Sequence, residues 1–252
     1  MGIDTQHFPM SLIHPSLALP SRACAPEADE FRDWFTGFVH EGRNYGGAYF
    51  AEFDTRLLPF VDLVRDSRLA TPRILECGCF EGGHTTAMAL KLPDARVTAV
   101  DVREGSLERA RRLAALRGCG NVRFCQDDLD DPQVAFTQEY DFIYCVGLLY
   151  HLRWPFAFLS RCAKAAPRLW LWTVLCAEFE AGHLEGTYRG RLYPEPVEHP
   201  LSGVRDTSFF LSLGSLYDML WQVGYRSVSL RQREVMKDGT GPAVLLCAST
   251  EA

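Results

Sequence analysis

The most constraining feature of the chain is a glycine-containing segment between two apolar runs. The first run reaches Glu76 and is followed by Gly78 and Gly82, and the second run ends about 20 residues later in Asp101. A strand, a glycine loop, a helix and a second strand ending in a carboxylate form a nucleoside-binding βαβ unit. Glycine lets the backbone approach a ligand closely, and a carboxylate accepts hydrogen bonds from ribose hydroxyls. The segment therefore predicts a ligand that carries a ribose.

The spacing of these glycines argues against two kinds of phosphate-binding loop. Dinucleotide-binding folds use G-x-G-x-x-G, whereas this loop has Gly78, Gly82 and Gly83. A phosphate-cradling loop ends in Gly-Lys-Ser or Gly-Lys-Thr, and the loop has no such ending. Both phosphate-binding interpretations are therefore weakened.

With these residues the chain resembles the class I S-adenosylmethionine-dependent methyltransferases. Their first motif is similar to Glu76-x-Gly78-x-x-x-Gly82, and their second strand ends in an acidic residue that matches Asp101. The resemblance covers about residues 73–174 and implies a Rossmann-like fold with S-adenosylmethionine as the cofactor. It also implies that Asp101 holds the ribose diol.

Two later segments match further motifs of that family in the expected order. Residues 122–129 resemble the third-strand motif, in which Asp128 corresponds to the aspartate that meets the adenine amino group and Asp127 replaces a glycine. Residues 140–152 are similar to the fourth-strand motif and the loop over the methyl donor. The resemblance thus implies a cofactor-binding set of Glu76, Gly78, Asp101, Asp128, Leu129 and Cys145.

Composition limits the class of protein and its partners. The chain has 252 residues, 47% of them hydrophobic and 23% charged, which suits one full α/β domain with short additions. A net charge of −6 gives no general surface for nucleic acid or anionic membranes. No apolar run reaches membrane-spanning length. We therefore expect a small-molecule acceptor as the partner.

The nine cysteines lie mostly inside apolar runs, and the chain lacks a cationic start followed by an apolar signal segment. This pattern predicts reduced thiols and a cytoplasmic location. Cys77, Cys79 and His84 could suggest a metal site, but no Cys-x-x-Cys pair and no second cluster accompany them. We expect no metal.

Strands and helices alternate through the middle of the chain. Hydrophobic patterns predict strands near 73–77, 96–101, 122–125, 140–146 and 168–174, with helices near 83–91, 104–117 and 154–165. A helix over 213–223, stopped by Gly224, and strands over 227–230 and 243–248 follow. Together with the resemblance, this order predicts a doubly wound, mostly parallel seven-stranded sheet.

Two regions flank this core. Residues 1–26 contain prolines and turn-prone polar residues with little periodicity, which predicts an irregular arm. Aromatic and other apolar residues then recur at intervals of three and four, which predicts helices over 27–42 and 49–66. We therefore expect an arm and helical cap over residues 1–68 and a catalytic domain over 69–252. Residues 176–208 are rich in glycine and proline, which predicts a long loop over the active site.

Several side chains are candidates for roles beyond cofactor binding. His151 follows the fourth strand at the ligand-binding edge, so it is either a general base or part of the donor pocket. Arg43 and Tyr45 either reach the donor's carboxylate or belong to a solvated joint. Four residues of the second half either contact the acceptor or pack within their own segment. They are Tyr188, Arg191, Tyr193 and Phe209.

The hypothesis that follows is methyl transfer from S-adenosylmethionine to a small-molecule acceptor, in a biosynthetic context. Three alternatives keep the fold but change the function. They are a tRNA-modifying transferase, a non-methylating S-adenosylmethionine enzyme such as an intramolecular cyclase, and a module that only binds the donor. The residues leave the acceptor, the attacked atom and the oligomeric state open.

Overall fold

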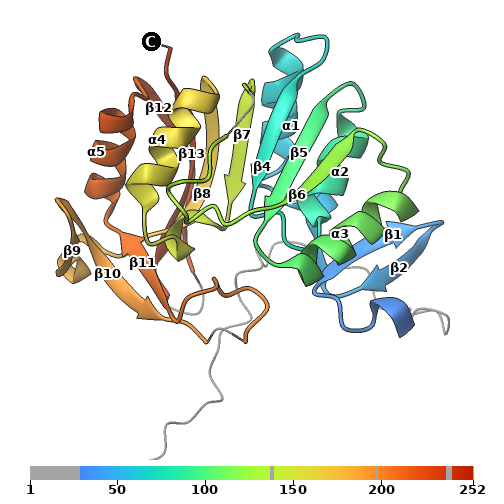
Figure 1. Cartoon of the computed structure of the whole chain (residues 1–252), viewed down its shortest axis with the longest axis horizontal. Helices are drawn as coiled ribbons and strands as arrows, with labels where there is room; N and C mark the ends of the chain where they lie inside the picture. Colours follow the sequence, from blue (N-terminus) through green and yellow to red (C-terminus); the bar gives the residue numbers. More distant parts are fainter. Residues whose placement is uncertain (1–28, 137–138, 197, 237–239, 252) are drawn as a thin grey trace, which may run out of the picture.

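A seven-stranded sheet forms the centre of the molecule in the computed structural model, which describes residues 29–136, 139–196, 198–236 and 240–251 (Figure 1). Its strands are β4 (Arg73–Cys77), β5 (Arg96–Asp101), β6 (Val122–Gln126), β7 (Phe142–Val146), β8 (Arg168–Val174), β12 (Ser227–Val235) and β13 (Pro242–Ser249). They lie in the order β12-β13-β8-β7-β4-β5-β6. Neighbours from β4 to β8 are parallel, and β13 pairs antiparallel with β8 and β12. The predicted mostly parallel sheet is confirmed.

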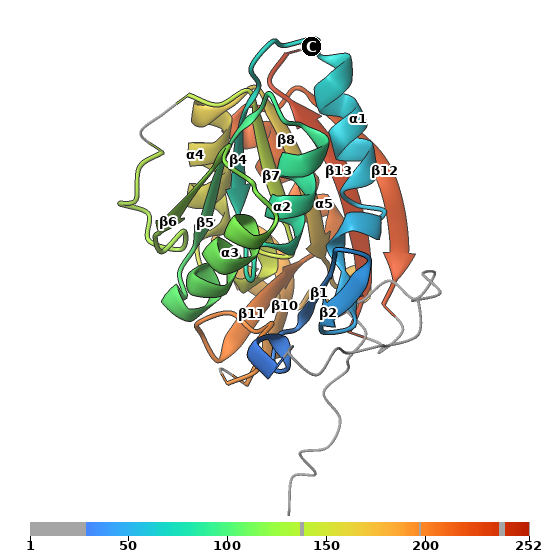
Figure 2. The ribbon, with the colours of Figure 1, turned by 90° about the vertical axis from the view of Figure 1, so that its right-hand side faces the viewer.

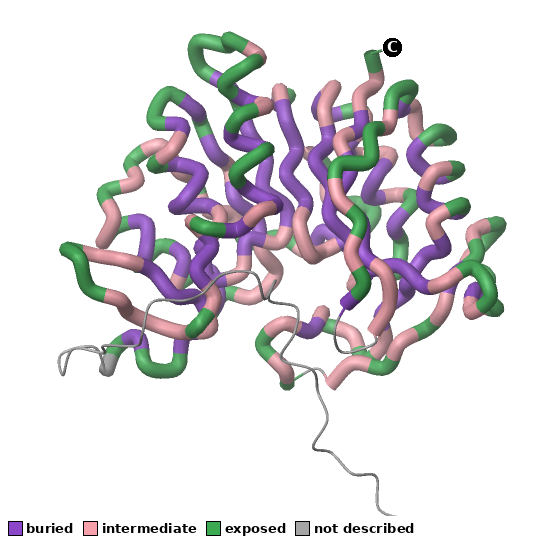
Figure 3. The backbone as a smooth tube through the Cα atoms, turned by 180° about the vertical axis from the view of Figure 1, so that it is seen from behind, coloured by how far each residue is buried: buried purple, intermediate pink, exposed green. Residues whose placement is uncertain are grey.

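Helices pack on both faces of this sheet (Figure 2). They are α1 (Leu58–Asp66), α2 (Gly83–Lys91), α3 (Glu104–Leu116), α4 (Pro155–Ala165) and α5 (Leu213–Val223). In β8, Leu171 joins the core under α4 and α5, while its neighbour Trp170 joins the core under α1 and α2. Buried residues accordingly concentrate along the central strands (Figure 3).

The strand order places the ligand-binding edge. β4 lies between β5 and β7, so the chain leaves β4 toward one side of the sheet and later returns to its other side. At such a switch point the loops after the two strands separate, and a crevice forms at their carboxyl ends. The crevice is therefore bordered by the glycine loop after β4 and the segment after β7.

The N-terminal segment differs from its prediction. In place of a helix over 27–42, the chain forms η1 (Asp29–Phe31) and then a hairpin of β1 (Thr36–His40) and β2 (Arg43–Gly46). Glu41 and Gly42 have φ values of 48° and 73°, as a two-residue hairpin turn requires. The helical spacing of the aromatic residues misled the prediction, because turn chemistry and pairing of the strands decide this segment.

The helix predicted over 49–66 begins only at Leu58. Before it lie β3 (Tyr49–Phe50), which pairs with β1, and the short η2 (Ala51–Phe53). Asp54 then accepts a hydrogen bond from the backbone N–H of Arg56, which forms a turn, and Pro59 stands in the first turn of the helix, where it is well tolerated. The predicted helical cap is therefore a three-stranded sheet with one helix. The predicted arm over 1–26 lies outside the described residues.

The predicted loop over 176–208 is also largely a sheet. After η4 (Glu178–Glu180), the strands β9 (His183–Glu185), β10 (Tyr188–Pro194) and β11 (Thr207–Leu211) form an antiparallel sheet in the order β11-β10-β9. Gly190 is required there, because a Cβ would lie 2.5 Å from the carbonyl oxygen of Phe210. Residues 195–196 and 198–206, between β10 and β11, form no strand. Figure 1 shows both small sheets at the lower edge of the central sheet, one on each side.

Three further observations concern the described part of the chain. None of its helices is long and apolar enough to cross a membrane. It contains no group of three or more His, Cys, Asp or Glu residues that could hold a metal ion. Its eight cysteines are free.

Candidate active site

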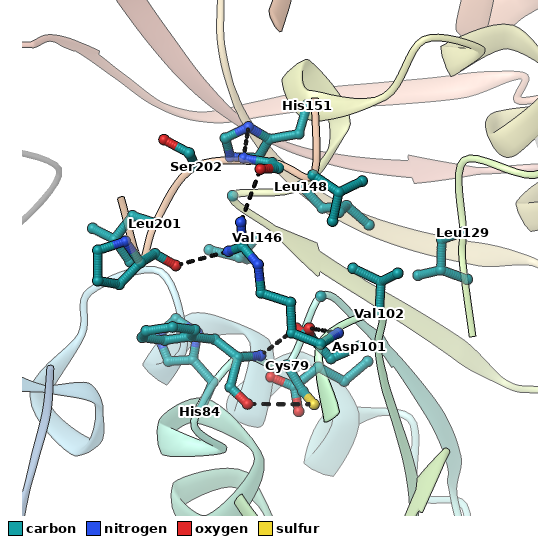
Figure 4. A pocket seen from close by; sticks show the side chains of 18 of the residues that line it. Cys79, His84, Asp101, Val102, Leu129, Val146, Leu148, His151, Leu201 and Ser202 are labelled. Carbon is teal, nitrogen blue, oxygen red and sulfur yellow. Dashed lines mark hydrogen bonds between the residues drawn. The ribbon is translucent and has the colours of Figure 1, made fainter. Parts of the chain in front are cut away.

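A cavity opens at the carboxyl ends of β4, β5, β6 and β7 (Figure 4). In that view His151, Leu201 and Ser202 lie on one side of the cavity, and Asp101 and Cys79 lie on the other. The N-terminal hairpin region contributes Phe35 and Tyr49 to the same lining. Segments between residues 35 and 204 therefore meet at this edge.

The glycine loop after β4 forms the floor of the cavity. The backbone N–H groups of Gly78 and Cys79 both donate to the carbonyl oxygen of Val100, which holds the loop against the end of β5. Gly78 has φ of +77°, and a Cβ there would lie 3.2 Å from that of Leu148. A larger residue would be strained and crowded at once. This position therefore needs glycine.

Glu76 supplies a buried carboxylate beside the loop. Its side chain is 2% exposed, and its Oε2 has no hydrogen-bond partner among the described residues. Burial raises the pKa of Glu76 to about 8, and the Asp101 carboxylate acts in the same direction. Because Glu76 lines the cavity, a ligand with a hydrogen-bond donor or a cation can satisfy this oxygen.

Asp101 ends β5 with a fixed orientation. Its Oδ2 accepts the backbone N–H of Phe80 at 2.8 Å, and its Oδ1 accepts that of Arg103 at 2.9 Å. Burial raises the pKa of Asp101, although these two bonds act against the rise. Each oxygen retains acceptor capacity toward the cavity, so the carboxylate can bind two neighbouring hydroxyls.

The third strand contributes Asp127, Asp128 and Leu129 to the cavity. Asp127 is exposed, whereas Asp128 is half-buried and its Oδ1 accepts the backbone N–H of Asp130 at 2.9 Å. Leu129 is buried and offers an apolar surface. The three residues thus combine polar and apolar contacts, as a nucleobase requires.

His151 lies across the cavity in η3 (Leu149–His151), just after β7. Its Nδ1 is 2.9 Å from Oε2 of Glu195, and both side chains are at least nine-tenths buried. The backbone N–H of Gly203 also donates to that oxygen at 3.0 Å. Burial opposes the charge of Glu195, but the hydrogen bond and charge of His151 outweigh it and lower the pKa of Glu195.

A polar cluster also borders the cavity on the side of the N-terminal segment. The Tyr49 hydroxyl is 2.6 Å from Nε2 of His84 and donates to Asp54, which also binds Arg56. The Tyr144 hydroxyl is 3.3 Å from Nδ1 of His84. Burial disfavours the charge of Asp54, but the Arg56 guanidinium beside it holds the pKa of Asp54 far below its usual range. Tyr49, His84 and Arg56 line the cavity, while Asp54 stands behind them.

The segment over residues 200–204 completes the lining. Arg103 donates to the carbonyl oxygens of Pro200 at 3.1 Å and Gly203 at 2.9 Å. Arg205 forms an ion pair with the buried Asp130, with an N–O distance of 2.6 Å. The segment is therefore fastened to the loops after β5 and β6.

Comparison with solved structures and family models agrees with this architecture. A family model described as a methyltransferase domain matches residues 74–166. The N-terminal domain of EvdMO1, crystallised in the presence of SAH and D-fucose, aligns with a TM-score of 0.76 at 23% identity over 88% of this chain and 94% of that one. Magnesium protoporphyrin IX methyltransferase from Synechocystis PCC 6803, with bound SAH, has a TM-score of 0.53 at 19% identity, over 77% and 81% of the two chains.

Residues 74–166 match a methyltransferase domain, and the fold is that of the class I S-adenosylmethionine-dependent methyltransferases. Curated relatives match the chain over part of their length. The ubiquinone biosynthesis O-methyltransferase of Xanthomonas oryzae pv. oryzae is 29% identical over 136 residues, which cover 52% of this chain and 56% of that protein. An uncharacterized protein of Synechococcus sp. is 37% identical over 105 residues, or 41% and 25% of the two chains. The chain thus spans about half or less of the length of these relatives.

Most of the predicted cofactor residues line the cavity, and three do not. Cys145 is fully buried in the core, and the cavity is lined instead by Val146 and Gly147 after it. Arg43 is exposed on β2, and Tyr45 packs against the aromatic rings of the hairpin. Because their segment is a hairpin and not the joint between two helices, neither side chain reaches the lining.

The four predicted acceptor residues also lie outside the cavity lining. Tyr188 stacks on Phe156, and Tyr193 stacks on Phe210. Arg191 donates to Glu180 and to the carbonyl oxygen of Thr240. Phe209 is buried in the core. Three of the four belong to β10 and the fourth to β11, whose contacts build the small sheet itself.

Four residues at the site were missed or given another role by the sequence analysis. They are Tyr49, His84, Arg56 and Glu195. His84 was considered only as a metal ligand, although it directly follows the glycine loop. Tyr49 and Glu195 carry no local motif, because they meet His84 and His151 across 35 and 44 residues. Arg56 binds the nearby Asp54, but this pair matches no motif that the sequence analysis used.

Proposed function

We propose that this cavity binds S-adenosylmethionine and that the protein transfers its methyl group to a hydroxyl of a small-molecule acceptor. The observation that best supports this proposal is the pair of carboxyl groups at the ends of the neighbouring strands β4 and β5. Glu76 has a buried oxygen without a partner, and Asp101 keeps acceptor capacity for a diol. Asp101 would hold the ribose, Asp128 with Leu129 the adenine, and Glu76 the amine of the donor.

The sulfonium group of this cofactor supplies an electrophilic methyl group. The residues of the chain then have to align the acceptor, exclude water and remove a proton. Phe35, Leu148 and Leu201 are apolar parts of the lining, which favours exclusion of water. Tyr49 and Arg56 line the same cavity and offer hydrogen bonds that can orient the acceptor.

Transfer to oxygen is supported by His151. A hydroxyl keeps its proton at neutral pH, so its methylation needs a base, and imidazole titrates in that range. The names of the curated relatives, ubiquinone biosynthesis O-methyltransferases, agree with an oxygen acceptor. The D-fucose present with the EvdMO1 domain agrees with a hydroxylated small molecule. His151 is therefore the proposed general base.

Product analysis tests this function. The purified protein is incubated with S-adenosylmethionine, alone and with a panel of sugars and phenols, and the products are measured by mass spectrometry. We expect S-adenosylhomocysteine together with a methylated hydroxyl. Methylthioadenosine from the donor alone would contradict methyl transfer and favour a cyclase. Binding without any consumption of the donor would leave only a binding module.

We also propose that the protein works in the cytoplasm. The free thiols of its eight described cysteines agree with a reducing compartment. Fractionation of the source cells, followed by immunodetection, tests this location.

A further inference from the structure

We infer that Glu195 is a positioning residue, which holds His151 in the tautomer and orientation needed for a general base. This inference rests on the proposed methyl transfer. Glu195 does not line the cavity, whereas His151 does. The carboxylate binds the imidazole from behind, through Nδ1, at 2.9 Å. It therefore acts on the reaction only through the histidine.

The hydrogen bonds around Glu195 determine where the proton of His151 lies. The backbone N–H of Gly203 is shared between Oε2 of Glu195 at 3.0 Å and Nδ1 of His151 at 3.1 Å, and the Ser208 hydroxyl lies 3.3 Å from the same Nδ1. An ionised carboxylate only accepts hydrogen bonds, so the 2.9 Å contact between Nδ1 and Oε2 requires the proton to be on Nδ1. Nδ1 of His151 must then donate to that oxygen. A neutral imidazole has one N–H, so Nε2 keeps its lone pair. No described residue forms a hydrogen bond with Nε2, which leaves it available to the acceptor.

The proton balance of the proposed reaction uses this tautomer. Methylation of a hydroxyl forms a C–O bond and breaks the C–S bond of the sulfonium, whose sulfur keeps the electron pair. The proton of the hydroxyl passes to Nε2 of His151. The resulting imidazolium is stabilised by the Glu195 carboxylate, and it returns its proton to water after the product leaves.

The alternative is that the His151–Glu195 pair serves only to hold the segment of residues 200–204 in place, and the other contacts of that segment argue against it. The segment that carries Gly203 is already held by Arg103, and Arg205 binds Asp130. Neither of these contacts involves His151 or Glu195. Removing the charge of Glu195 should therefore leave the segment in place and change only the histidine.

The chain offers a matched control. His183 and Glu185 form a second histidine–glutamate pair on β9, with Nε2 and Oε1 3.3 Å apart. Both side chains are 39% exposed, and neither lines the cavity. Glu185→Gln therefore removes the same charge from the same kind of pair without touching the site.

The first experiment compares Glu195→Gln with Glu185→Gln in single turnovers at saturating donor and acceptor. For Glu195→Gln we expect a rate lower by roughly 10- to 1000-fold, with donor affinity unchanged. The acidic limb of its pH–rate profile should move to lower pH, because the imidazolium loses its anionic partner. Glu185→Gln should match the native protein. In a His151→Ala background, Glu195→Gln should cause no further loss.

The second experiment needs no turnover. Nitrogen-15 NMR of the native protein should show His151 protonated at Nδ1, and Glu195→Gln should shift the ring toward a mixture of tautomers. A native His151 protonated at Nε2 would overturn the inference, as would an unchanged rate and pH profile in Glu195→Gln. If the native protein binds the donor but transfers no methyl group, the proposed function fails, and the NMR result still tests the pair.

Discussion

The two walls of the cavity are built in different ways. The donor wall consists of Glu76, Asp101 and Asp128, which stand at or just past the ends of β4, β5 and β6, so their order in the chain is their order in space. The opposite wall, which we assign to the acceptor, combines the N-terminal segment, η3 and residues 200–204, with Glu195 behind His151. Its parts meet only through long-range packing. A wall made of neighbouring parallel strands has a sequence motif, and a wall made of distant segments has none.

The carboxylates of the two walls differ as well. On the donor wall, burial raises the pKa of Glu76 to about 8 and also raises that of Asp101. On the acceptor wall, cationic or proton-donating partners lower the pKa of Asp54 and Glu195 despite their burial. On the donor wall, a ligand that brings a positive charge or hydrogen-bond donors would reverse this rise, whereas on the acceptor wall the carboxylates orient the protein's own side chains.

The largest effect should come from bulk on the donor wall. Gly78→Val should abolish donor binding, because its side chain would meet Leu148 and its backbone would be strained. Gly118→Val is the control, since Gly118 also has a left-handed φ, +69°, but is exposed and has free space around it. Calorimetric titration with S-adenosylhomocysteine measures the difference. Normal binding by Gly78→Val would place the donor elsewhere.

The next effect concerns the acceptor wall. His151→Ala should lower the single-turnover rate by about 10²–10⁴, because the hydroxyl loses its base, while donor binding stays near the native value. His183→Ala, outside the cavity, should leave the rate unchanged. Should the donor affinity fall while the rate of the bound complex stays native, His151 would belong to the donor wall and the division between the two walls would be wrong.

A smaller effect should follow from loss of the ribose carboxylate. Asp101→Ala should weaken donor binding by about 1–3 kcal/mol, the usual range for removal of a charged hydrogen-bond partner. Asp94→Ala, at an exposed position outside the cavity, is the control for the effect of losing one negative charge. Calorimetry measures both, and equal affinities would remove Asp101 from the donor wall.

The last prediction concerns the dependence of stability on pH and leaves ligand binding aside. An unfolded Glu76 ionises near 4.5, and the folded one near pH 8, so the unfolded state loses its proton first as the pH rises. Between these values the native protein should lose stability relative to Glu76→Gln, by at most about 1.4 kcal/mol per pH unit. Urea unfolding across this range measures the slope. As a control, the free energy of unfolding of Glu108→Gln, at an exposed position, should depend on pH as that of the native protein does. If Glu76→Gln also showed the native pH dependence, the raised pKa of Glu76 would be refuted.

The sequence by itself determined the central sheet and most of the donor wall. The strands at 73–77, 96–101 and 168–174 and the helices at 83–91 and 213–223 have the predicted bounds. In these segments the apolar period, the glycines and the strand-end carboxylates all indicate the same structure, because each signal depends on residues close in the chain.

Tertiary structure decided most of the acceptor wall, for which the sequence indicated only His151 and the 176–208 segment. Aromatic residues at helical spacing became a hairpin, since Glu41 and Gly42 turn the chain and β1 finds partners on both sides. The predicted loop became a sheet through pairing of β10 with β11. Glu195, which directly follows β10, meets His151 across 44 residues. Contacts of this kind depend on packing between segments far apart in the chain, so a local sequence pattern cannot predict them.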